Sequence, residues 1–76
     1  MNWRDRIVSD PNICHGQTCI RGTRVLVSVV LDNLAAGESH RDIQAGYDLT
    51  EEDIQAVLQY AAELSKERMS PLPDVA

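Results

Sequence analysis

Two arginines, Arg21 and Arg24, flank a Gly-Thr pair and are the side chains in this sequence best suited to bind an anion. A guanidinium presents its N–H donors in a fixed plane and pairs in a bidentate manner with phosphate or carboxylate. Gly22 favours a bend with positive φ, and the hydroxyl of Thr23 can hydrogen-bond nearby backbone. The segment therefore predicts a rigid turn that presents two positive charges to one region of space. The alternative interpretation is that both arginines are ordinary solvated side chains.

Four other side chains could ligate a metal or act in nucleophilic catalysis: Cys14, His15, Cys19 and His40. Their spacing does not match the paired ligands of zinc sites, and neighbours on an extended segment point apart. A Cys-His nucleophile also needs a third group that orients the pair, and the sequence indicates none. We therefore expect no metal, no cofactor and no enzymatic activity, with Cys19 as a small buried residue.

The composition describes a small acidic protein. A chain of 76 residues forms one domain whose core is marginal without a partner, so we expect association. Its two cysteines are too few for a disulfide framework, and the sequence shows no signal peptide and no long apolar run. These features predict a cytoplasmic protein, and the net charge of −5 argues against non-specific coating of nucleic acid.

The charge is distributed unevenly along the chain. Residues 1–24 carry four arginines against two aspartates, a net charge of +2, whereas residues 25–76 carry three basic and ten acidic side chains, a net charge of −7. The four N-terminal arginines are Arg4, Arg6, Arg21 and Arg24. We expect them to project from a β-ribbon toward a phosphate backbone or an acidic partner, while the rest of the surface faces water or a basic partner.

The N-terminal third predicts two short strands. Ile7 and Val8 favour a strand near residues 5–8, and Ser-Asp-Pro-Asn after them is a strong turn signal. Residues 12–18 are predicted to form a loop, followed by a second strand at 18–20. Strands this short must pack on helices or pair with strands of a second subunit.

Apolar residues at helical spacing predict two of three helices, over residues 27–36 and 51–67. The first stripe consists of Val27, Val30, Leu31 and Leu34, and the second of Ile54, Val57, Leu58 and Ala61. Gly37 is placed to cap the first helix at its C-terminus.

Between these helices lies a shorter one, with Ser39 at its N-cap and Asp42 three residues on, that ends near Gly46. Thr50 and Asp53 repeat this spacing at the start of the long helix. Three helices in this order are typical of a trihelical, helix-turn-helix or winged-helix-like domain. We predict a mainly α fold with a short N-terminal β element, formed by residues 1–69 and followed by a C-terminal tail at 70–76.

Several segments of the chain together resemble the domain-of-unknown-function 433 family, small bacterial and archaeal proteins regarded as antitoxins. The segments are Ile7-Val8-Ser9-Asp10-Pro11, His15-Gly16-Gln17-Thr18-Cys19-Ile20-Arg21-Gly22-Thr23-Arg24-Val25, Ala36-Gly37-Glu38-Ser39 and Tyr47-Asp48-Leu49-Thr50-Glu51-Glu52-Asp53-Ile54. The resemblance runs from Ile7 to about Ala62. The sequence departs from the family pattern before the turn, where Gly-Gly-Lys-Pro is commoner than the His-Gly-Gln-Thr found here, so no lysine can act at that place.

The resemblance implies a helix-turn-helix-like homodimer that pairs with a toxin similar to a PIN-domain ribonuclease. Such nucleases hold metal with clustered carboxylates, so Arg24 or Arg68 of the tail could enter that acidic site and neutralise it. Gln55 and Gln59, one turn apart on the long helix, are candidate base readers if this helix enters a major groove. Acidic residues 51–53 at the start of the same helix would repel phosphates.

We therefore expect an antitoxin that binds and neutralises a PIN-like ribonuclease toxin and can also bind its own operator DNA as a dimer. The expected contact residues are Arg4, Arg6, Arg21, Gly22, Thr23, Arg24, Gln55, Gln59 and Arg68. Two alternatives stay open: a DNA-binding transcriptional regulator without a toxin, and a protein-interaction adaptor that uses the acidic long helix.

Overall fold

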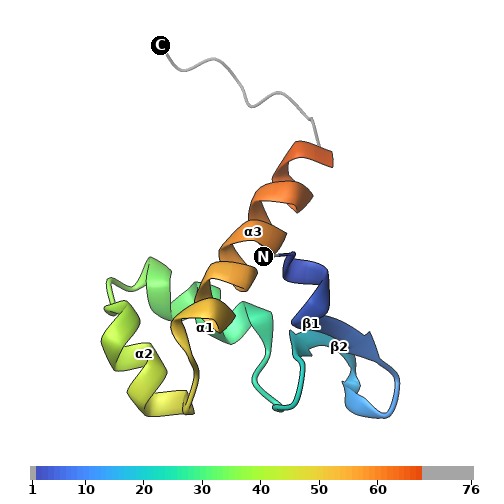
Figure 1. Ribbon diagram of the computed structural model, residues 1–76, viewed down its shortest axis with the longest axis horizontal. Helices are drawn as coiled ribbons and strands as arrows, with labels where there is room; N and C mark the ends of the chain where they lie inside the picture. Colours follow the sequence, from blue (N-terminus) through green and yellow to red (C-terminus); the bar gives the residue numbers. More distant parts are fainter. Residues whose placement is uncertain (1, 68–76) are drawn as a thin grey trace.

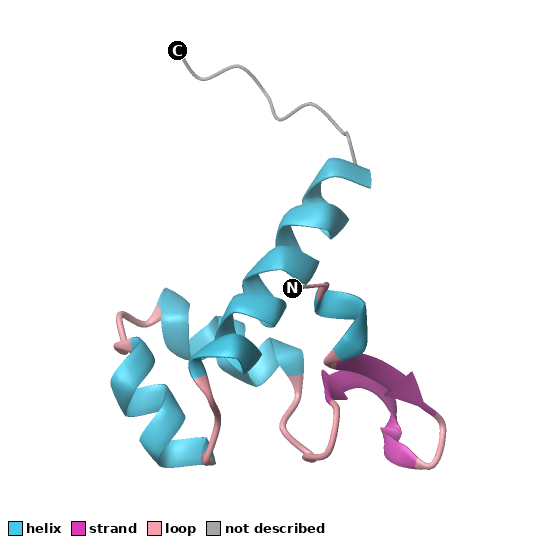
Figure 2. Ribbon diagram, viewed as in Figure 1, coloured by secondary structure: helices cyan, strands magenta, loops and turns pink. Residues whose placement is uncertain are grey.

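Three α-helices follow a two-stranded hairpin in the computed structural model, which describes residues 2–67 of the chain (Figures 1 and 2). The N-terminal part consists of a short 3₁₀ helix and two strands: η1 Trp3–Asp5, β1 Ile7–Asp10 and β2 Ile13–Ile20. The helices are α1 Val27–Ala35, α2 His40–Tyr47 and α3 Glu51–Glu67. The predicted fold class, mainly helical with a short N-terminal β element, is confirmed. The predicted tail at 70–76 lies outside the described residues.

The two strands pair with each other within one chain, in antiparallel register, with Ile7 opposite Ile20. The first strand begins at Ile7, and the prediction that it starts at residue 5 is wrong. The reason is local: the side chain of Asn2 accepts a hydrogen bond from the backbone N–H of Arg4 at 3.0 Å, so residues 3–5 turn as η1.

The second strand is longer than the predicted segment at 18–20 because the hairpin turn is tight. Asp10 pairs directly with Ile13, and its carboxylate accepts a hydrogen bond from the Asn12 N–H at 2.8 Å. This side-chain turn closes the hairpin over Pro11 and Asn12. The register then shifts between Ser9 and Asp10, so residues 14–17 lie outside the paired positions.

Residues 14–16 of this bulge have left-handed backbone conformations, with φ of 52° at Cys14, 55° at His15 and 81° at Gly16. This region costs a residue with a Cβ atom about 1–2 kcal/mol. Two contacts hold the bulge in place: the Ser9 hydroxyl donates to the Gly16 carbonyl at 2.6 Å, and the Cys14 thiol donates to the Arg24 carbonyl at 3.4 Å. The bulge is therefore tied to the arginine-bearing segment that follows β2.

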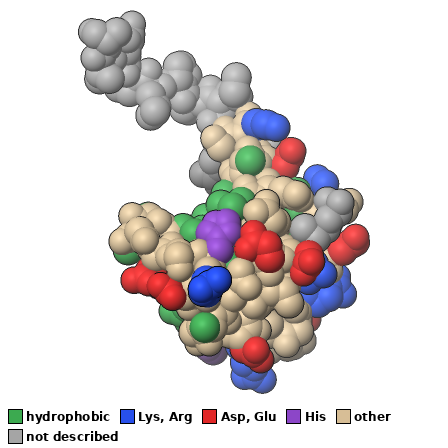
Figure 3. Space-filling model, turned by 60° about the vertical axis from the view of Figure 1, so that its left-hand side comes forward, with side chains coloured by type: hydrophobic (Ala, Val, Ile, Leu, Met, Phe, Trp, Pro, Cys, Tyr) green, Lys and Arg blue, Asp and Glu red, His purple; other side chains and the backbone are tan. Residues whose placement is uncertain are grey.

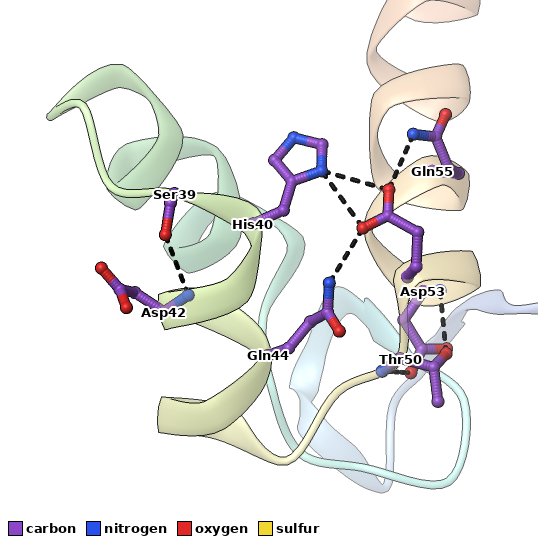
Figure 4. Close-up of polar contacts among 8 residues, drawn as sticks. Ser39, His40, Asp42, Gln44, Thr50, Asp53 and Gln55 are labelled. Carbon is purple, nitrogen blue, oxygen red and sulfur yellow. Dashed lines mark hydrogen bonds and ion pairs between the residues drawn. The ribbon is translucent and has the colours of Figure 1, made fainter.

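The predicted cap at Gly37 ends α1. Its N–H donates to the Leu34 carbonyl, and the N–H of Glu38 donates to the Asn33 carbonyl, both at 3.0 Å. These two bonds form a Schellman motif, which requires the positive φ of 91° found at Gly37. The predicted start of α2 is also confirmed, because the Ser39 hydroxyl accepts a hydrogen bond from the Asp42 N–H at 3.1 Å (Figure 4).

A reciprocal capping box starts α3. The Asp53 N–H donates to the Thr50 hydroxyl at 3.2 Å, and the Thr50 N–H donates to the Asp53 carboxylate at 3.0 Å (Figure 4). Before it, α2 ends at Tyr47, and Asp48 takes the left-handed conformation that turns the chain toward α3. The helix starts after Thr50, as the spacing predicts.

The core lies where the hairpin and all three helices meet, and it is small. Its buried apolar residues are Ile7, Cys19, Ile20, Val27, Val30, Ile43, Leu49, Ile54, Ala56 and Val57. Both predicted helical stripes face this core, with Leu31, Leu34 and Leu58 packed against its edge. Among residues 2–67 no helix is long and apolar enough to cross a membrane.

Candidate anion-binding surface

The predicted rigid turn spans residues 21–24 and is closed at its base by backbone. The N–H of Ile20 donates to the Val25 carbonyl at 3.0 Å, and the N–H of Arg21 donates to the Arg6 carbonyl at 2.6 Å. A backbone pairing between Cys19 and Leu26 continues the closure. These contacts hold the turn to Arg6, directly before β1, and to Leu26, the N-cap of α1.

Thr23 and Gly22 determine the conformation within the turn. The Thr23 hydroxyl donates to the Ile20 carbonyl at 2.7 Å and accepts from the Val25 N–H at 3.0 Å. Gly22 has a φ of 80°, and a Cβ atom at this position would meet nothing within 4 Å. Glycine is therefore required here for its backbone freedom and not for space.

Arg21 and Arg24 are both exposed, and neither guanidinium forms an ion pair with any residue in the described part of the chain. Their backbones are held by the hairpin and by Cys14, as described above. Two long, charged side chains without an ion-pair partner among the described residues thus extend from a backbone that hydrogen bonds hold in place. This arrangement suits the binding of phosphate or carboxylate.

Arg6 differs from these two arginines because its guanidinium is already paired. Its Nη1 atom lies 2.9 Å from Oδ1 of Asp53, whose side chain is 12% exposed. The other carboxylate oxygen of Asp53 caps α3 through Thr50. Arg6 therefore connects the start of the hairpin to α3, and its predicted projection toward an external anion is opposed by this structural contact.

Arg4 lies in η1 and not on the β-ribbon where the sequence led us to expect it. Its guanidinium carbon lies 4.6 Å from the centre of the Trp3 ring, a cation–π contact. Trp3 in turn packs edge-on against Tyr60 of α3, with 5.1 Å between ring centres. The side chain is exposed, so Arg4 adds positive charge on η1, which packs against α3.

Gln55 and Gln59, the predicted base readers, differ in their surroundings. The Gln55 amide donates to the Glu51 carboxylate at 3.0 Å, and Gln59 is half-buried. The same carboxylate also accepts from the Gln44 amide at 2.9 Å and lies 3.1 Å from Nδ1 of His40 (Figure 4). Gln55 is thus part of a polar network that joins α2 to α3.

This network lowers the pKa of Glu51 below its ordinary value of 4.5, first through the hydrogen bond from Gln55 and then through His40. The carboxylate therefore stays ionised at neutral pH, next to the exposed Glu52. Acidic and basic side chains are both scattered over this side of the molecule, where a histidine lies beside several acidic groups (Figure 3). The start of α3 is consequently an unfavourable surface for a phosphate backbone.

The cysteine and histidine side chains form no metal site in the part of the chain that the structure describes. Cys19 is fully buried, and this burial, followed by the neighbouring Cys14 thiol, raises its pKa. A buried thiol with a raised pKa is a poor nucleophile and a poor metal ligand. The interpretation of Cys19 as a small buried residue is confirmed.

One predicted contact residue cannot be placed, and one ion pair was not predicted from the sequence. Arg68, predicted to contact a toxin, lies outside the described residues. The pairing of Arg6 with Asp53 was missed, because the two residues are 47 positions apart. The capping spacing of Thr50 and Asp53 correctly predicts where that carboxylate sits on α3, but it carries no signal for its second partner.

The sequence that forms the hairpin, the arginine-bearing turn and the helices matches a protein family described as "Protein of unknown function (DUF433)" over residues 7–61. This range includes both strands, α1, α2 and most of α3. The chain belongs to this family, which confirms the resemblance found in the sequence. No curated protein and no solved structure matches the chain.

Proposed function

We propose that this protein is an antitoxin that binds a PIN-like ribonuclease toxin as a homodimer, with Arg21 and Arg24 as its principal contacts. One observation carries the proposal: two exposed guanidiniums stand on a backbone fixed by several hydrogen bonds, without a partner in residues 2–67. Two guanidiniums on a rigid backbone, without an ion-pair partner in this part of the chain, are suited to bind an external anion. The small core favours a dimer.

The acidic metal site of a PIN-like nuclease is the partner that fits this turn best. A bidentate guanidinium can pair with the carboxylates that would otherwise hold the metal, and this would remove the nuclease activity. The rest of the chain carries a large excess of acidic residues, so a second broad contact with nucleic acid is disfavoured. The turn therefore accounts for both recognition and inhibition.

The test uses the nuclease encoded beside this chain, mixed with the wild-type protein and with the double variant Arg21→Ala/Arg24→Ala. We expect the wild type to bind and inhibit, and the double variant to bind at least ~100-fold more weakly, because truncating one side of a buried charge pair costs ~2–5 kcal/mol. Calorimetry and an RNA-cleavage assay measure the two effects.

Arg41→Ala is the matched control, since Arg41 is exposed on α2, far from the hairpin (Figure 1). It should bind and inhibit as the wild type does. Absence of both complex and inhibition with wild-type protein would contradict the antitoxin proposal. Equal losses in the control and in the double variant would assign the effect to overall charge.

A DNA-binding regulator without a toxin is the second candidate, and the α2–α3 pair favours it. The two helices are joined by residues 48–50 in the manner of a helix-turn-helix motif. Because the start of α3 is acidic, we expect the turn arginines to contact phosphate and α3 to contribute little. The antitoxin proposal includes binding of this kind to the operator.

The salt dependence of operator binding tests this second use of the turn. Arg21→Ala/Arg24→Ala should reduce the slope of log K against log salt by about 2 per chain, because each lost phosphate contact accounts for ~0.9. The variant Arg21→Lys/Arg24→Lys keeps the slope if phosphate is the target, but weakens a bidentate contact with carboxylate. An unchanged slope in the alanine variant would exclude the turn from DNA contact.

A further inference from the structure

A groove of about 520 Å³ lies between the bulged part of β2, α1 and the C-terminal half of α3. Val27, Leu31, Tyr60 and Leu64 form its apolar walls, and Thr18 and Ser28 supply hydroxyl groups. None of the turn arginines lines this groove. It is therefore a second surface, separate from the candidate anion-binding site.

The burial of α3 changes along its length at this groove. Ile54, Ala56 and Val57 are fully buried, whereas Tyr60 is half-buried and Leu64 is 37% exposed. The apolar stripe thus continues for two more turns, over which the described residues 2–67 cover it only in part. Figure 1 shows these turns of α3 extending past the hairpin and the other helices.

The charge of the groove indicates what covers it. Among residues 2–67, none that lines the groove carries a charge, although the whole chain has a net charge of −5. Two copies of an acidic protein repel each other least where their charged groups are absent. Beside the groove, Glu63 and Lys66 on α3 have opposite signs and form only a long 3.9 Å contact, so each is free to meet its counterpart on a second copy.

We propose that a second copy of this chain covers the groove, with Tyr60 and Leu64 of each α3 packed against the groove of the other copy. The face is self-complementary, since the same surface offers a projecting apolar helix and an apolar recess to receive it. A two-fold axis requires this property. Tyrosine is also enriched at binding interfaces, and Thr18 and Ser28 add polar groups to the apolar lining.

This inference rests on the dimer named in the proposed function and assigns its interface. Its test needs neither toxin nor DNA, so its failure can be told apart from failure of the antitoxin proposal. A dimer formed through another face could still inhibit a nuclease. Conversely, a protein with no toxin could still dimerise through this groove.

The experiment compares full-length wild type, Leu64→Asp and Ser65→Asp by sedimentation equilibrium. Both variants add one negative charge to an exposed position on the same turn of α3, but only Leu64 lines the groove. We expect a wild-type dimer, a dissociation constant raised at least ~30-fold in Leu64→Asp, and a change of less than about threefold in Ser65→Asp. Circular dichroism checks that α3 stays helical in both variants.

Trp3 gives a second measurement because it is the single tryptophan in the sequence and packs against Tyr60. Its fluorescence should change on dilution of the wild type, over the range in which the mass falls, and should not depend on concentration in Leu64→Asp. A Leu64→Asp variant that dimerises as the wild type does overturns this inference alone. A monomeric wild type overturns it together with the homodimer of the proposed function, and leaves the proposed toxin binding to its own test.

Discussion

At the scale of single residues, four arginines of the same segment have three different environments. Arg4 stacks on an aromatic ring, Arg6 pairs with a carboxylate, and Arg21 and Arg24 reach solvent from a fixed turn. The charge of each is the same, so the difference comes from what each side chain contacts. Only the last two are available to an external anion without the loss of a structural contact.

The Arg6–Asp53 pair should stabilise the fold. Asp53→Asn should lower the free energy of unfolding by about 1–3 kcal/mol, because a charged hydrogen bond in a partly buried site is lost. Urea unfolding of Arg6→Gln, Asp53→Asn and the double variant gives the coupling energy, expected at about 1 kcal/mol. Arg21→Gln is the control and should show no coupling to Asp53→Asn. A coupling near zero for Arg6 would show that the pair is only a surface contact.

Gly22→Ala should destabilise the protein by about 1 kcal/mol, because alanine at a φ of 80° is strained even in open space. Gly46 is the matched control. It lies inside α2, has no positive φ, and also has nothing near its missing Cβ atom. Gly46→Ala should therefore stabilise by roughly 0.5–1 kcal/mol. Thermal unfolding measures both changes, and shifts of the same sign would contradict this account of the turn.

At the scale of elements, side-chain contacts at helix ends hold α2 and α3 together. Thr50 and Asp53 cap α3, while His40, Gln44 and Gln55 converge on the carboxylate of its first residue (Figure 4). That carboxylate also interacts favourably with the positive end of the helix. A polar network at the junction of the two helices thus adds to the apolar packing of Ile43 and Ile54 in the core.

The lowered pKa of Glu51 predicts how pH acts on this junction. The folded-state pKa is below the ordinary 4.5, so the contribution of Glu51 to stability is fully present above that value and is lost as pH falls through the folded pKa. Glu51→Gln should therefore have a lower free energy of unfolding than wild type at pH 7, and this difference in free energy should shrink below pH 4.5. Urea unfolding across this pH range measures the difference.

Glu52→Gln serves as the control for that series, since it removes the same charge from an exposed neighbour that makes no side-chain hydrogen bond within residues 2–67. At pH 7, Glu52→Gln should lower the free energy of unfolding by less than Glu51→Gln does. If Glu51→Gln matched wild type at every pH, the network would contribute nothing to the joining of α2 and α3.

At the scale of the whole molecule, the protein combines a small apolar core with an uneven distribution of charge. Ten apolar residues are buried among the described ones, and a domain of this size has only a few kcal/mol of net stability. The segments that flank the hairpin carry the four N-terminal arginines, and α2 and α3 carry six of the twelve acidic side chains of the sequence. The proposed interface covers the apolar surface that the core leaves exposed and leaves the arginine turn free.

Association should therefore appear in thermal stability. If a second copy binds only the folded chain, the unfolding midpoint of wild type rises with protein concentration, by mass action. Scanning calorimetry over a hundredfold range of concentration measures this rise. Leu64→Asp should show a midpoint that is independent of concentration, and Ser65→Asp should follow the wild type. A wild-type midpoint that does not change with concentration would indicate that the folded chain is stable alone.

The sequence by itself determined the helices, their caps, the inward stripes and the turn around Gly22. These features depend on residues within four positions of one another, where periodicity and capping spacing are direct physical signals. Val57 faces the core because the helical period places it on the same face as Ile54. Thr50 caps α3 through Asp53, three positions away.

Only the tertiary structure decided which charges are used and which surface is left uncovered. Arg6 meets Asp53 across 47 positions, the strands pair within the chain over a bulge, and Leu64 lines a groove that residues 2–67 leave open. Each depends on how separate elements pack, and a local pattern does not encode a distance between residues far apart in the chain. The sequence does not distinguish these arginines from one another. Within residues 2–67, packing brings a carboxylate to Arg6 and to neither Arg21 nor Arg24, so Arg6 has a structural contact and the other two can bind an external anion.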